Sequence, residues 1–203
     1  MRITLVTDVT RYPDLNKRLH YALQSVPNLP FAISLWMRDK QLTPPEATVW
    51  ADRWRWLCDR HGLRFEISLH HAHLINSGDV LHVPDVPKLR HQAHQHYRKH
   101  HRILSLHGLD QLGIALANPE IEVMLSPLYR PFSKEWAGTL LDRKGLEALK
   151  RQERERIHLM GGLTVDRITP ILSGNFASYA LMTAWQSKPD VFFKDMASRV
   201  KQS

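Results

Sequence analysis

Short apolar runs alternate with longer stretches of helical character along the whole chain, and this alternation restricts the fold more than any other feature. Most runs are four to seven residues long and are bounded by Pro, Gly, Asp or Asn, as buried strands are. They lie at 3–8, 31–37, 64–68, 79–83, 102–106, 122–126, 157–160 and 177–182. Helices are predicted between them at 44–62, 87–101, 108–118, 143–154 and 164–175, the last shortened or kinked by Pro170.

Strands that alternate with helices pair in parallel through right-handed crossovers. Eight such units in 203 residues predict a (β/α)8 TIM barrel, at the short end of the length range of that fold. A doubly wound open sheet is the alternative. No repeat, low-complexity segment or linker divides the sequence, so residues 1–203 are predicted to form a single domain.

Composition and cysteine use predict a soluble cytoplasmic protein. Hydrophobic residues make up 43% and charged residues 24%, and no apolar stretch approaches the roughly 20 residues of a membrane span. The first residues, MRITLVTDVT, are interrupted by Asp8 and predict a strand rather than a signal peptide. The lone Cys58 excludes an internal disulfide, fits a reducing compartment, and is expected to pack inertly in its helix.

Polar residues follow the predicted strands at the ends where barrel enzymes place their chemistry. They are Asp8, Arg38, Lys40, Ser68, His70, His71, Asp85, Ser105, His107, residues 126–134, Gly161, Gly162 and Thr183. The formal net charge of +8 attracts phosphates in general, whether small substrates or nucleic acid. A site for an anion is therefore predicted at these strand ends.

One loop concentrates several of these groups. The segment LSPLYRPFSK, residues 125–134, contains two prolines together with Arg130, Ser133 and Lys134. Prolines end regular structure, and two cations with a hydroxyl donor suit a bound anion. A solvated basic loop is the alternative interpretation.

Two further segments could hold a phosphate through the backbone. Gly161 and Gly162 follow a strand and precede a helix, so their N–H groups could approach a ligand oxygen. The next strand ends in MTAW, with Thr183 and Ala184, and barrels often bind phosphate between their last two loops. A simple Gly-Gly turn is the alternative.

Two side-chain groups could carry recognition and proton transfer. Arg38 and Lys40 share one face of an extended strand end, with Asp39 pointing away, and could grip a dianion. Two ordinary surface cations are the alternative. His107 directly follows a strand and could act as a general acid or base, although a lone histidine is more often structural.

The other histidines and the tryptophans are expected to serve structure. Five histidines share the 87–101 stretch with arginine and lysine but with no carboxylate or thiolate, which favours a solvated basic helix over a metal site. Trp50 and Trp54 share a helix face, which favours packing against the barrel over base stacking. Nucleic acid is therefore not the expected partner.

Seven segments occur in the same order as the motifs of the thiamine phosphate synthase/TenI superfamily, which the chain resembles along nearly its whole length. They are ITLVTD, SLWMRDK, VLHVPDVP, ILSLHG, LSPLYRPFSKEW, LMGGLTVDRI and YALMTAW. The resemblance implies a (β/α)8 barrel, and it is more specific for the superfamily than for a reaction. Members of the superfamily commonly form dimers or larger assemblies, which suggests a homo-oligomer.

The superfamily contains two activities. Its synthases join a pyrimidine pyrophosphate to a thiazole phosphate with Mg²⁺, whereas its TenI members shift a proton in a thiazole phosphate carboxylate without a metal. By match to the motifs, the residues that would grip pyrophosphate in a synthase are Arg38, Lys40, Ser105 and Lys134, with Ser133 beside them. Those that would hold the thiazole phosphate are Gly161, Gly162, Thr183 and Ala184. His107 would take the place of the TenI acid/base histidine, with Lys134 as the second candidate catalytic residue.

Departures from the synthase pattern favour the TenI-like activity. Ser68 and Leu69 stand where synthases carry Asn-Asp, and Trp36 replaces a pyrimidine-binding Gln. Asp85 alone matches a metal ligand, so Mg²⁺ is expected only in a synthase and no cofactor in a TenI-like protein. The expected partner is a small phosphorylated heterocycle, a thiazole phosphate. A diverged synthase and a non-catalytic binding or assembly protein remain the alternatives.

Overall fold

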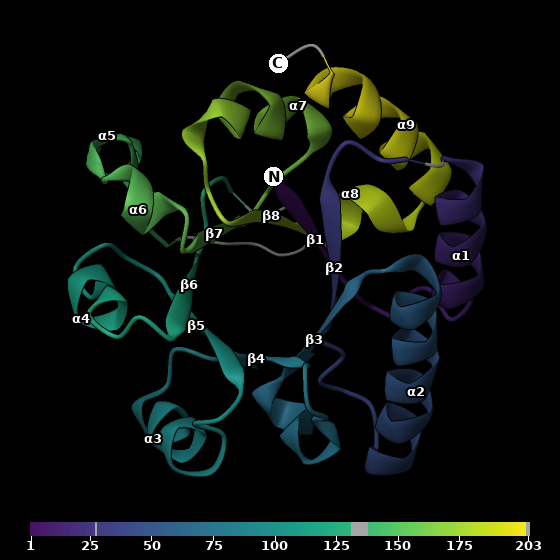
Figure 1. Ribbon diagram of the computed structural model, residues 1–203, viewed down its shortest axis with the longest axis horizontal. Helices are drawn as coiled ribbons and strands as arrows, with labels where there is room; N and C mark the ends of the chain where they lie inside the picture. The colour runs from purple at the N-terminus through teal and green to yellow at the C-terminus, as the bar shows by residue number, and fades with distance from the viewer. Residues whose placement is uncertain (27, 131–137, 202–203) are drawn as a thin grey trace.

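Eight parallel strands close into a barrel in which neighbouring strands are consecutive in the sequence (Figure 1). The computed structural model describes residues 1–26, 28–130 and 138–201. The strands are β1 (Arg2–Val6), β2 (Ala32–Met37), β3 (Arg64–Ser68), β4 (Val80–Val83), β5 (His101–Leu106), β6 (Ile121–Leu125), β7 (Ile157–Met160) and β8 (Ser178–Leu181). Pairing of β1 with β8, with Ile3 opposite Tyr179, completes the ring. The predicted (β/α)8 barrel is therefore confirmed, and the open-sheet alternative is wrong.

Helices surround the barrel on its outer side (Figure 1). The α-helices are α1 (Leu15–Ser25), α2 (Pro44–His61), α3 (Pro87–His96), α4 (Leu112–Leu116), α5 (Arg143–Ala148), α6 (Arg151–Arg154), α7 (Val165–Ile168), α8 (Thr183–Gln186) and α9 (Pro189–Val200). Two 3-10 helices, η1 (Leu69–Leu74) and η2 (Thr169–Gly174), complete the connections. Within the described part of the chain, no helix combines the length and the apolar character needed to cross a membrane.

Helix α2 forms where the sequence predicts it because both of its ends are capped. Thr43 and Glu46 form a capping box, in which the Glu46 carboxylate accepts from the Thr43 backbone N–H at 2.9 Å. At the other end Gly62 takes the left-handed conformation, with φ 65°, and its position satisfies the last helical carbonyls.

Two helices are shorter than their patterns predict. The 87–101 stretch is helical only to His96, because the chain turns after Tyr97 and enters β5 at His101. The 108–118 stretch is helical only as α4. In both cases the polar residues at the ends match a helical pattern but bury no apolar face, so nothing in the packing extends the helix.

Two other predicted helices are interrupted. The 143–154 stretch divides into α5 and α6, because Leu149 and Lys150 are extended with ψ of 144° and 152°. The 164–175 stretch is the short α7 followed by η2, with Pro170 in the first turn of η2. Proline lacks the N–H that a continuous α-helix would need at that position, which explains the change of helix type.

The main core lies between the strands and the helices and consists mostly of aliphatic side chains, with several large aromatic ones among them. Trp54, Trp185 and Phe193 are fully buried there. Trp50 stacks on Trp54 with ring centroids 5.5 Å apart, as the shared helix face predicts. Trp56 is 58% exposed and belongs to the opposite face of α2. The tryptophans of α2 that share a face are thus accounted for by packing.

The inside of the barrel is unusually polar for this fold, whose interior normally consists of bulky branched residues. A small apolar cluster that includes Val6, Trp36 and Met124 fills one layer. In another layer lie buried polar side chains, namely Thr4, Ser34, Glu66, His82, His158 and Ser178. Buried polar groups are stable only when they bond to one another, so this layer needs an internal network.

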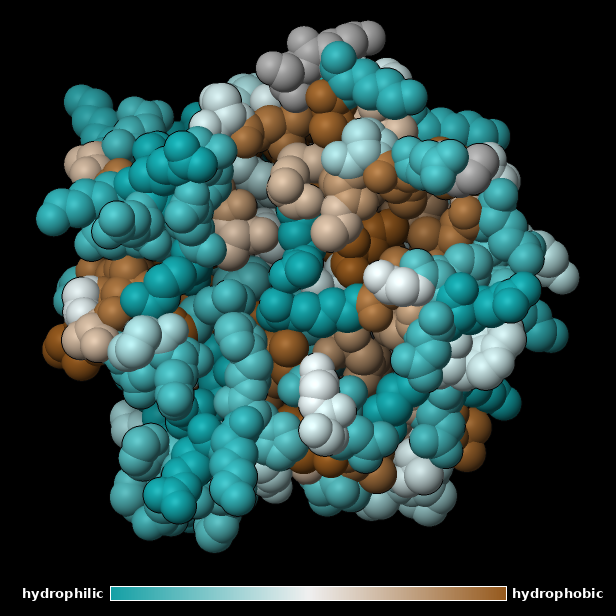
Figure 2. Space-filling view, viewed as in Figure 1, coloured by the Kyte–Doolittle hydropathy of each residue, from teal (hydrophilic) through white to brown (hydrophobic). Residues whose placement is uncertain are grey.

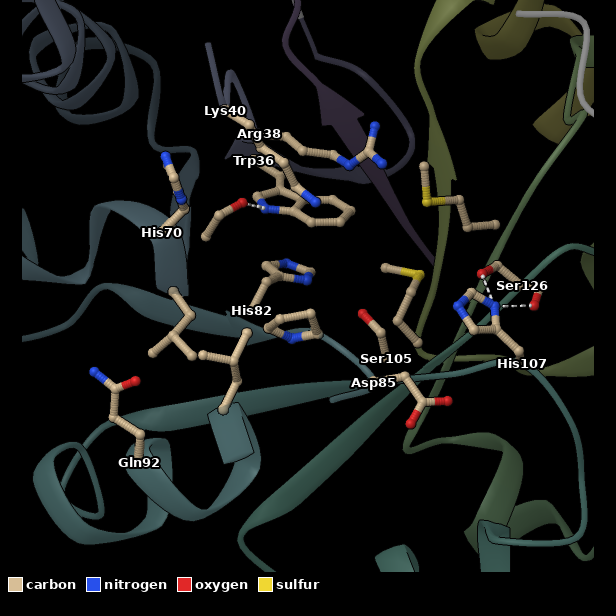
Figure 3. Close-up of a pocket in the computed structure, with 16 residues that line it drawn as sticks. Trp36, Arg38, Lys40, His70, His82, Asp85, Gln92, Ser105, His107 and Ser126 are labelled. Carbon is tan, nitrogen blue, oxygen red and sulfur yellow. Dashed lines mark hydrogen bonds between the residues drawn. The ribbon is translucent and has the colours of Figure 1, made fainter. Parts of the chain in front are cut away.

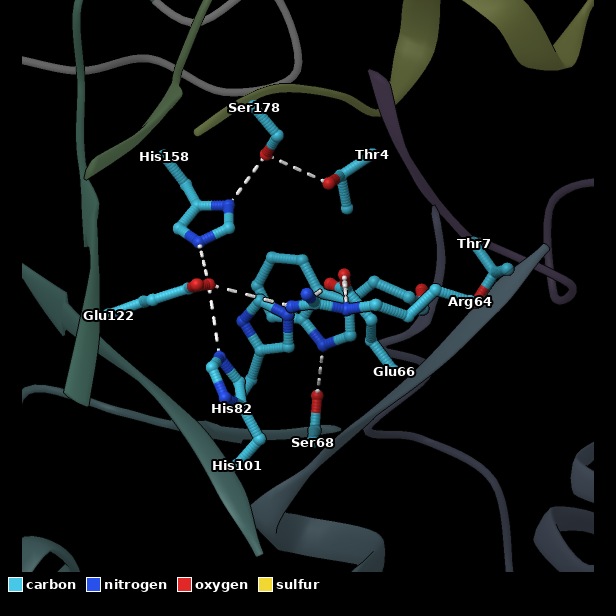
Figure 4. A network of polar contacts seen from close by, with 11 residues as sticks. Thr4, Thr7, Arg64, Glu66, Ser68, His82, His101, Glu122, His158 and Ser178 are labelled. Atoms are coloured by element: carbon cyan, nitrogen blue, oxygen red, sulfur yellow. Dashed lines mark hydrogen bonds and ion pairs between the residues drawn. The ribbon is translucent and has the colours of Figure 1, made fainter. Parts of the chain in front are cut away.

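Two carboxylates organise that network (Figure 4). Glu66 binds His82 Nε2 at 2.6 Å and Arg64 Nε at 3.1 Å. Glu122 binds His158 Nε2 at 2.6 Å and His101 Nε2 at 3.1 Å. Arg64 also lies 3.6 Å from Glu122 and so joins the two halves.

The charges of this network follow from its contacts. Burial raises the pKa of Glu66, but the hydrogen bond from His82 and the charge of Arg64 outweigh that effect and lower the pKa to about 2. Burial lowers the pKa of His82, and the hydrogen bond and charge of Glu66 oppose that effect. A carboxylate oxygen only accepts, so His82 donates to it from Nε2. The pKa of Glu122 is likewise lowered: its bonds from His101 and His158 outweigh the effect of burial. The barrel therefore contains two ionised carboxylates.

Candidate functional site

A pocket of about 300 Å³ opens at the carboxyl ends of the strands, where the sequence predicts the site (Figure 3). Eight of the predicted strand-end residues line it: Arg38, Lys40, Ser68, His70, Asp85, Ser105, His107 and Ser126. Figure 3 shows Arg38 and Lys40 on one side of the pocket and Asp85, Ser105 and His107 on the other. The barrel thus brings together residues that are far apart in the sequence, because they end or follow different strands.

Arg38 and Lys40 are cations without a carboxylate partner. Neither forms an ion pair with any described residue, and Arg38 lies over the Trp36 ring at 5.8 Å. Burial lowers the pKa of Arg38, but a guanidinium keeps its charge in proteins. Arg38 is partly buried, and an unpaired charge in such a position is favourable for an anionic ligand and costly without one, whereas Lys40 is exposed beside it. The two side chains therefore suit the predicted anchoring of an anion.

Asp39 explains why both cations face the pocket. Its carboxylate is buried on the other side, where it accepts from Thr7 Oγ1 and, at 2.6 Å, from the Val9 N–H. Burial raises the pKa of this carboxyl, and the two hydrogen bonds oppose the rise. As expected from the period of two in extended chain, Asp39 points away from its neighbours, but it is held inside the protein instead of reaching the surface.

His107 is oriented by the end of β6. Its Nδ1 lies 2.9 Å from the Ser126 carbonyl oxygen and 3.3 Å from the Ser126 hydroxyl. A carbonyl oxygen can only accept, so in the neutral ring the proton resides on Nδ1. Nε2 then has a free lone pair and is the basic atom of the ring. This is the arrangement that an acid/base histidine requires.

Asp85 forms an ion pair with a neighbouring cation. It accepts a hydrogen bond from Arg90 of α3, and Arg90 also binds Gln111 Oε1 at 3.1 Å. Among the described residues that line the pocket it is the single carboxylate, and no group of three or more His, Cys, Asp or Glu side chains gathers in the described part of the chain. Mg²⁺ prefers several oxygen ligands in octahedral geometry. The described pocket offers Mg²⁺ one carboxylate, already bound to Arg90, so the ion would need phosphate oxygens of a substrate as further ligands.

The pocket also contains His82 and Gln92, which the sequence did not assign to a site. His82 stacks on Trp36 with ring centroids 3.7 Å apart, and Trp36 Nε1 donates to Ser68 Oγ at 3.0 Å. Gln92 of α3 also lines the pocket. The sequence does carry one signal for His82, a polar residue inside an otherwise apolar strand, which needs a buried partner.

Gly161 and Gly162 have a structural role that the phosphate interpretation did not anticipate. Their φ angles are 104° and 58°, and a Cβ on Gly161 would lie 2.6 Å from Pro127 Cα. On Gly162 it would lie 2.4 Å from the Arg130 carbonyl oxygen. The glycines thus let the loop after β6 pack directly on the end of β7. They are not among the residues that line the pocket.

The remaining predicted residues are not part of the described pocket either. Thr183 and Ala184 begin α8 at the end of β8, beyond Met182, whose Sδ lies 3.5 Å from Arg38 Nη1. Ser133 and Lys134 lie outside the described residues. Phosphate binding by these four residues and by the two glycines stays a prediction.

Cys58 and the three histidines of α3 agree with their expected structural roles, whereas His100 lies in the turn after α3 and His101 in β5, where it pairs with Glu122. Cys58 is buried, and burial raises the pKa of its thiol, which disfavours the reactive thiolate. The exposed histidines of α3 do not gather with other metal-ligating groups in the part of the chain described.

The architecture defines a (β/α)8 barrel protein with a polar pocket at the carboxyl ends of its strands. Compared by sequence, the chain matches no protein-family model and no curated protein. Compared by structure, it is similar to the thiamine phosphate pyrophosphorylase from Pyrococcus furiosus, with a TM-score of 0.74 and 13% identity over 99% of this chain and 96% of that one.

Two other solved structures show the breadth of the likeness. The thiamine phosphate pyrophosphorylase from Bacteroides thetaiotaomicron gives a TM-score of 0.62 at 13% identity, over 100% of this chain and 99% of that one. The phosphoribosyl anthranilate isomerase from Thermotoga maritima gives 0.58 at 14% identity, over 100% of both chains. At these identities the likeness confirms the thiamine phosphate synthase-like barrel as a fold.

Proposed function

We propose that this chain is a TenI-like barrel that binds a thiazole phosphate and catalyses a metal-independent proton shift in its ring. The observation that carries the proposal is the pairing of two cations without carboxylate partners, Arg38 and Lys40, with a correctly oriented His107 in one pocket. Two of the similar solved structures are named for thiamine phosphate, which supports a related substrate.

In the proposed reaction His107 moves one proton. Nε2 accepts a proton from a ring carbon of the bound heterocycle, and the Ser126 carbonyl stabilises the imidazolium through Nδ1–H. The same proton then returns to another ring position, so the substrate is isomerised and the imidazole is restored. Arg38 and Lys40 hold the anionic groups and fix the ring beside Nε2. Every step uses side chains of this chain and needs no further reactant.

The second activity of the superfamily, Mg²⁺-dependent coupling, has weaker support. A synthase needs carboxylates to hold the metal, and Asp85 is bonded to Arg90 in the described pocket. The proton shift is therefore the better match to the chemistry of these residues. If the protein formed thiamine phosphate in an assay with Mg²⁺ and both synthase substrates, the coupling reaction would be the better supported of the two activities.

Ligand binding is the first test. A thiazole phosphate at a hundred times its Kd should stabilise the protein by about 2.7 kcal/mol, measured as a raised melting temperature. Inorganic phosphate at the same concentration is the control, and the rise should not depend on Mg²⁺. The Arg38→Ala/Lys40→Ala variant should lose the rise. If phosphate alone raises the melting temperature equally, the thiazole part of the proposal is wrong.

Catalysis is tested separately through His107. The His107→Ala variant should bind the thiazole phosphate carboxylate but lower kcat by about 100- to 10,000-fold, the usual contribution of a general acid/base. His91→Ala, an exposed histidine on α3 outside the pocket, is the matched control and should leave kcat unchanged. A His107→Ala protein with wild-type kcat would refute the assigned role.

A further inference from the structure

A second concave surface lies at the amino-terminal ends of β5 and β6, away from the strand ends that form the candidate site. This basic groove has a volume of about 560 Å³ and is bounded by the turn before β5 and the loop before β6. It lies between α3 and α4, neighbours around the barrel in Figure 1. The space-filling view in Figure 2 shows mostly hydrophilic residues on the side of the molecule where α3 lies.

The first wall of the groove is a short turn that displays two cations. The N–H of Tyr97 donates to Ala93 O at 3.0 Å and that of His100 donates to Tyr97 O at 3.1 Å, which fixes the chain between α3 and β5. Arg98 and Lys99 occupy the centre of this turn and are exposed. Neither forms an ion pair with a described residue. The turn therefore holds positive charge at one edge of the groove.

The opposite wall is held by a partly buried arginine side chain. Arg156 donates to the carbonyl oxygens of Leu116, at 2.8 Å, of Asn118, and of Ile121, at 2.6 Å. These three hydrogen bonds fix the backbone of the loop before β6, and none of them uses a side chain that lines the groove. Glu120, whose N–H donates to Asn118 Oδ1 at 3.0 Å, is the only acidic residue among the described residues of the groove.

Arg102 forms the base of the groove and is the unusual residue there. It is 4% exposed, yet its side chain makes no hydrogen bond to any described residue, and its Nε is buried without a partner. Its nearest ion-pair partner is Glu120, which is itself 72% exposed, at 3.8 Å. A buried guanidinium with so little compensation is costly, and an anion in the groove would supply the missing acceptors.

We propose that the basic groove binds a small phosphate-bearing anion of the diphosphate class. The groove contains three permanent cations and one carboxylate, namely Arg98, Lys99, Arg102 and Glu120. The net charge of these four side chains is +2, which suits a ligand with two to three negative charges. Guanidinium groups bind phosphate oxygens in a bidentate manner, and Asn118 can donate from its amide. The small number of cations, three within one groove, and the single Glu120 beside them favour a compact anion over an extended nucleic acid backbone.

The site can be tested independently of the proposed enzymatic activity. Equilibrium dialysis with labelled inorganic diphosphate would be carried out on the Arg38→Ala/Lys40→Ala protein, so that the strand-end pocket does not contribute. We expect one diphosphate per chain. Adding Arg98→Ala/Lys99→Ala should weaken binding at least tenfold, whereas adding Lys17→Ala/Arg60→Ala, which removes the same charge from exposed positions on α1 and α2, should not.

Arg102→Met tests the base of the groove, with thermal unfolding as the check on folding. If the variant folds, diphosphate binding should be lost, and if it does not, the exposed pair Arg98 and Lys99 decides the question alone. Equal affinity in all variants, or no binding at millimolar diphosphate, would overturn the proposal. A short single-stranded RNA that displaces diphosphate and binds with a steep salt dependence would overturn it in favour of a nucleic acid surface.

Discussion

Replacing Glu66 by glutamine should destabilise the barrel strongly, because the carboxylate lies at the centre of the buried network. His82 Nε2 could still donate to the amide oxygen at the position of Glu66 Oε2. The amide NH2, however, would face the guanidinium of Arg64, whose Nε is 3.1 Å from Glu66 Oε1. Two donors would then meet in a fully buried site, and Arg64 would keep only Glu122 as a counter-charge.

The expected loss can be worked out from the pKa of Glu66. A carboxyl whose pKa falls from 4.5 to about 2 on folding contributes about 3 kcal/mol at neutral pH, since each pH unit is worth about 1.4 kcal/mol. Breaking a buried ion pair by removing one partner typically costs about 3–5 kcal/mol. The two figures agree, so we expect Glu66→Gln to lower the free energy of unfolding by about 3 kcal/mol.

The sign of the pH dependence follows from the same linkage. Above pH 4.5 the carboxylate is ionised in both states, and its contribution is complete. Below pH 4.5 the unfolded chain takes up a proton that the folded protein binds only near pH 2, so the contribution declines. Buried His82, with a lowered pKa, adds an acid sensitivity of the same sign, because its ring must gain a proton on unfolding.

Urea unfolding followed by tryptophan fluorescence would measure both effects. At pH 7 the variant should be less stable than wild type by about 3 kcal/mol, and at pH 3.5 this difference should have shrunk by about 1 kcal/mol. Glu147→Gln on the exposed face of α5 is the control and should stay within about 0.5 kcal/mol of wild type. A difference that is the same at both pH values would show that Glu66 is not an ionised partner of Arg64.

Two further predictions concern residues outside this network. Gly162→Ala should lower the free energy of unfolding by about 2–4 kcal/mol in urea unfolding, because the backbone at position 162 has a positive φ and the added Cβ would meet the Arg130 carbonyl. The control Gly113→Ala, on α4, adds its Cβ into open space and should not destabilise the protein, so equal stabilities of the two variants would contradict the packing role of Gly162. Cys58 should react with a thiol reagent only after unfolding, since burial raises the pKa of its thiol, and rapid labelling of the native protein would show that the site is open.

The sequence predicted the architecture because the fold repeats one simple unit. All eight apolar runs became strands, with ends shifted by at most two residues, since burial on both faces makes such runs distinctive. Helix lengths were predicted less well. The polar residues around Tyr97 and Leu149 match a helical pattern, but the way the chain must return to the barrel ends each helix earlier.

The sequence predicted those site residues whose location follows from their place at a strand end. It missed those whose role depends on contacts with side chains from distant strands. Arg38, Lys40 and His107 follow strands, so the barrel alone brings them to one end. The stacking of His82 on Trp36 depends on two strands that are not neighbours in the ring, and no local pattern reports it. Likewise the sequence showed two glycines after a strand, but only the structure shows that a second loop occupies the space they leave.

The polar layer of the barrel also restricts how this sequence can change over time. Ion pairs join Glu66, Glu122 and Arg64 to one another and to the histidines around them, so a substitution at any one of them leaves a charge or a donor stranded in the interior. An apolar barrel interior can change through single substitutions that add or remove one methyl group. This polar interior can be replaced only by simultaneous substitutions at several positions. Close relatives of this chain should therefore keep the whole set or have replaced it as a whole, with few intermediates between the two.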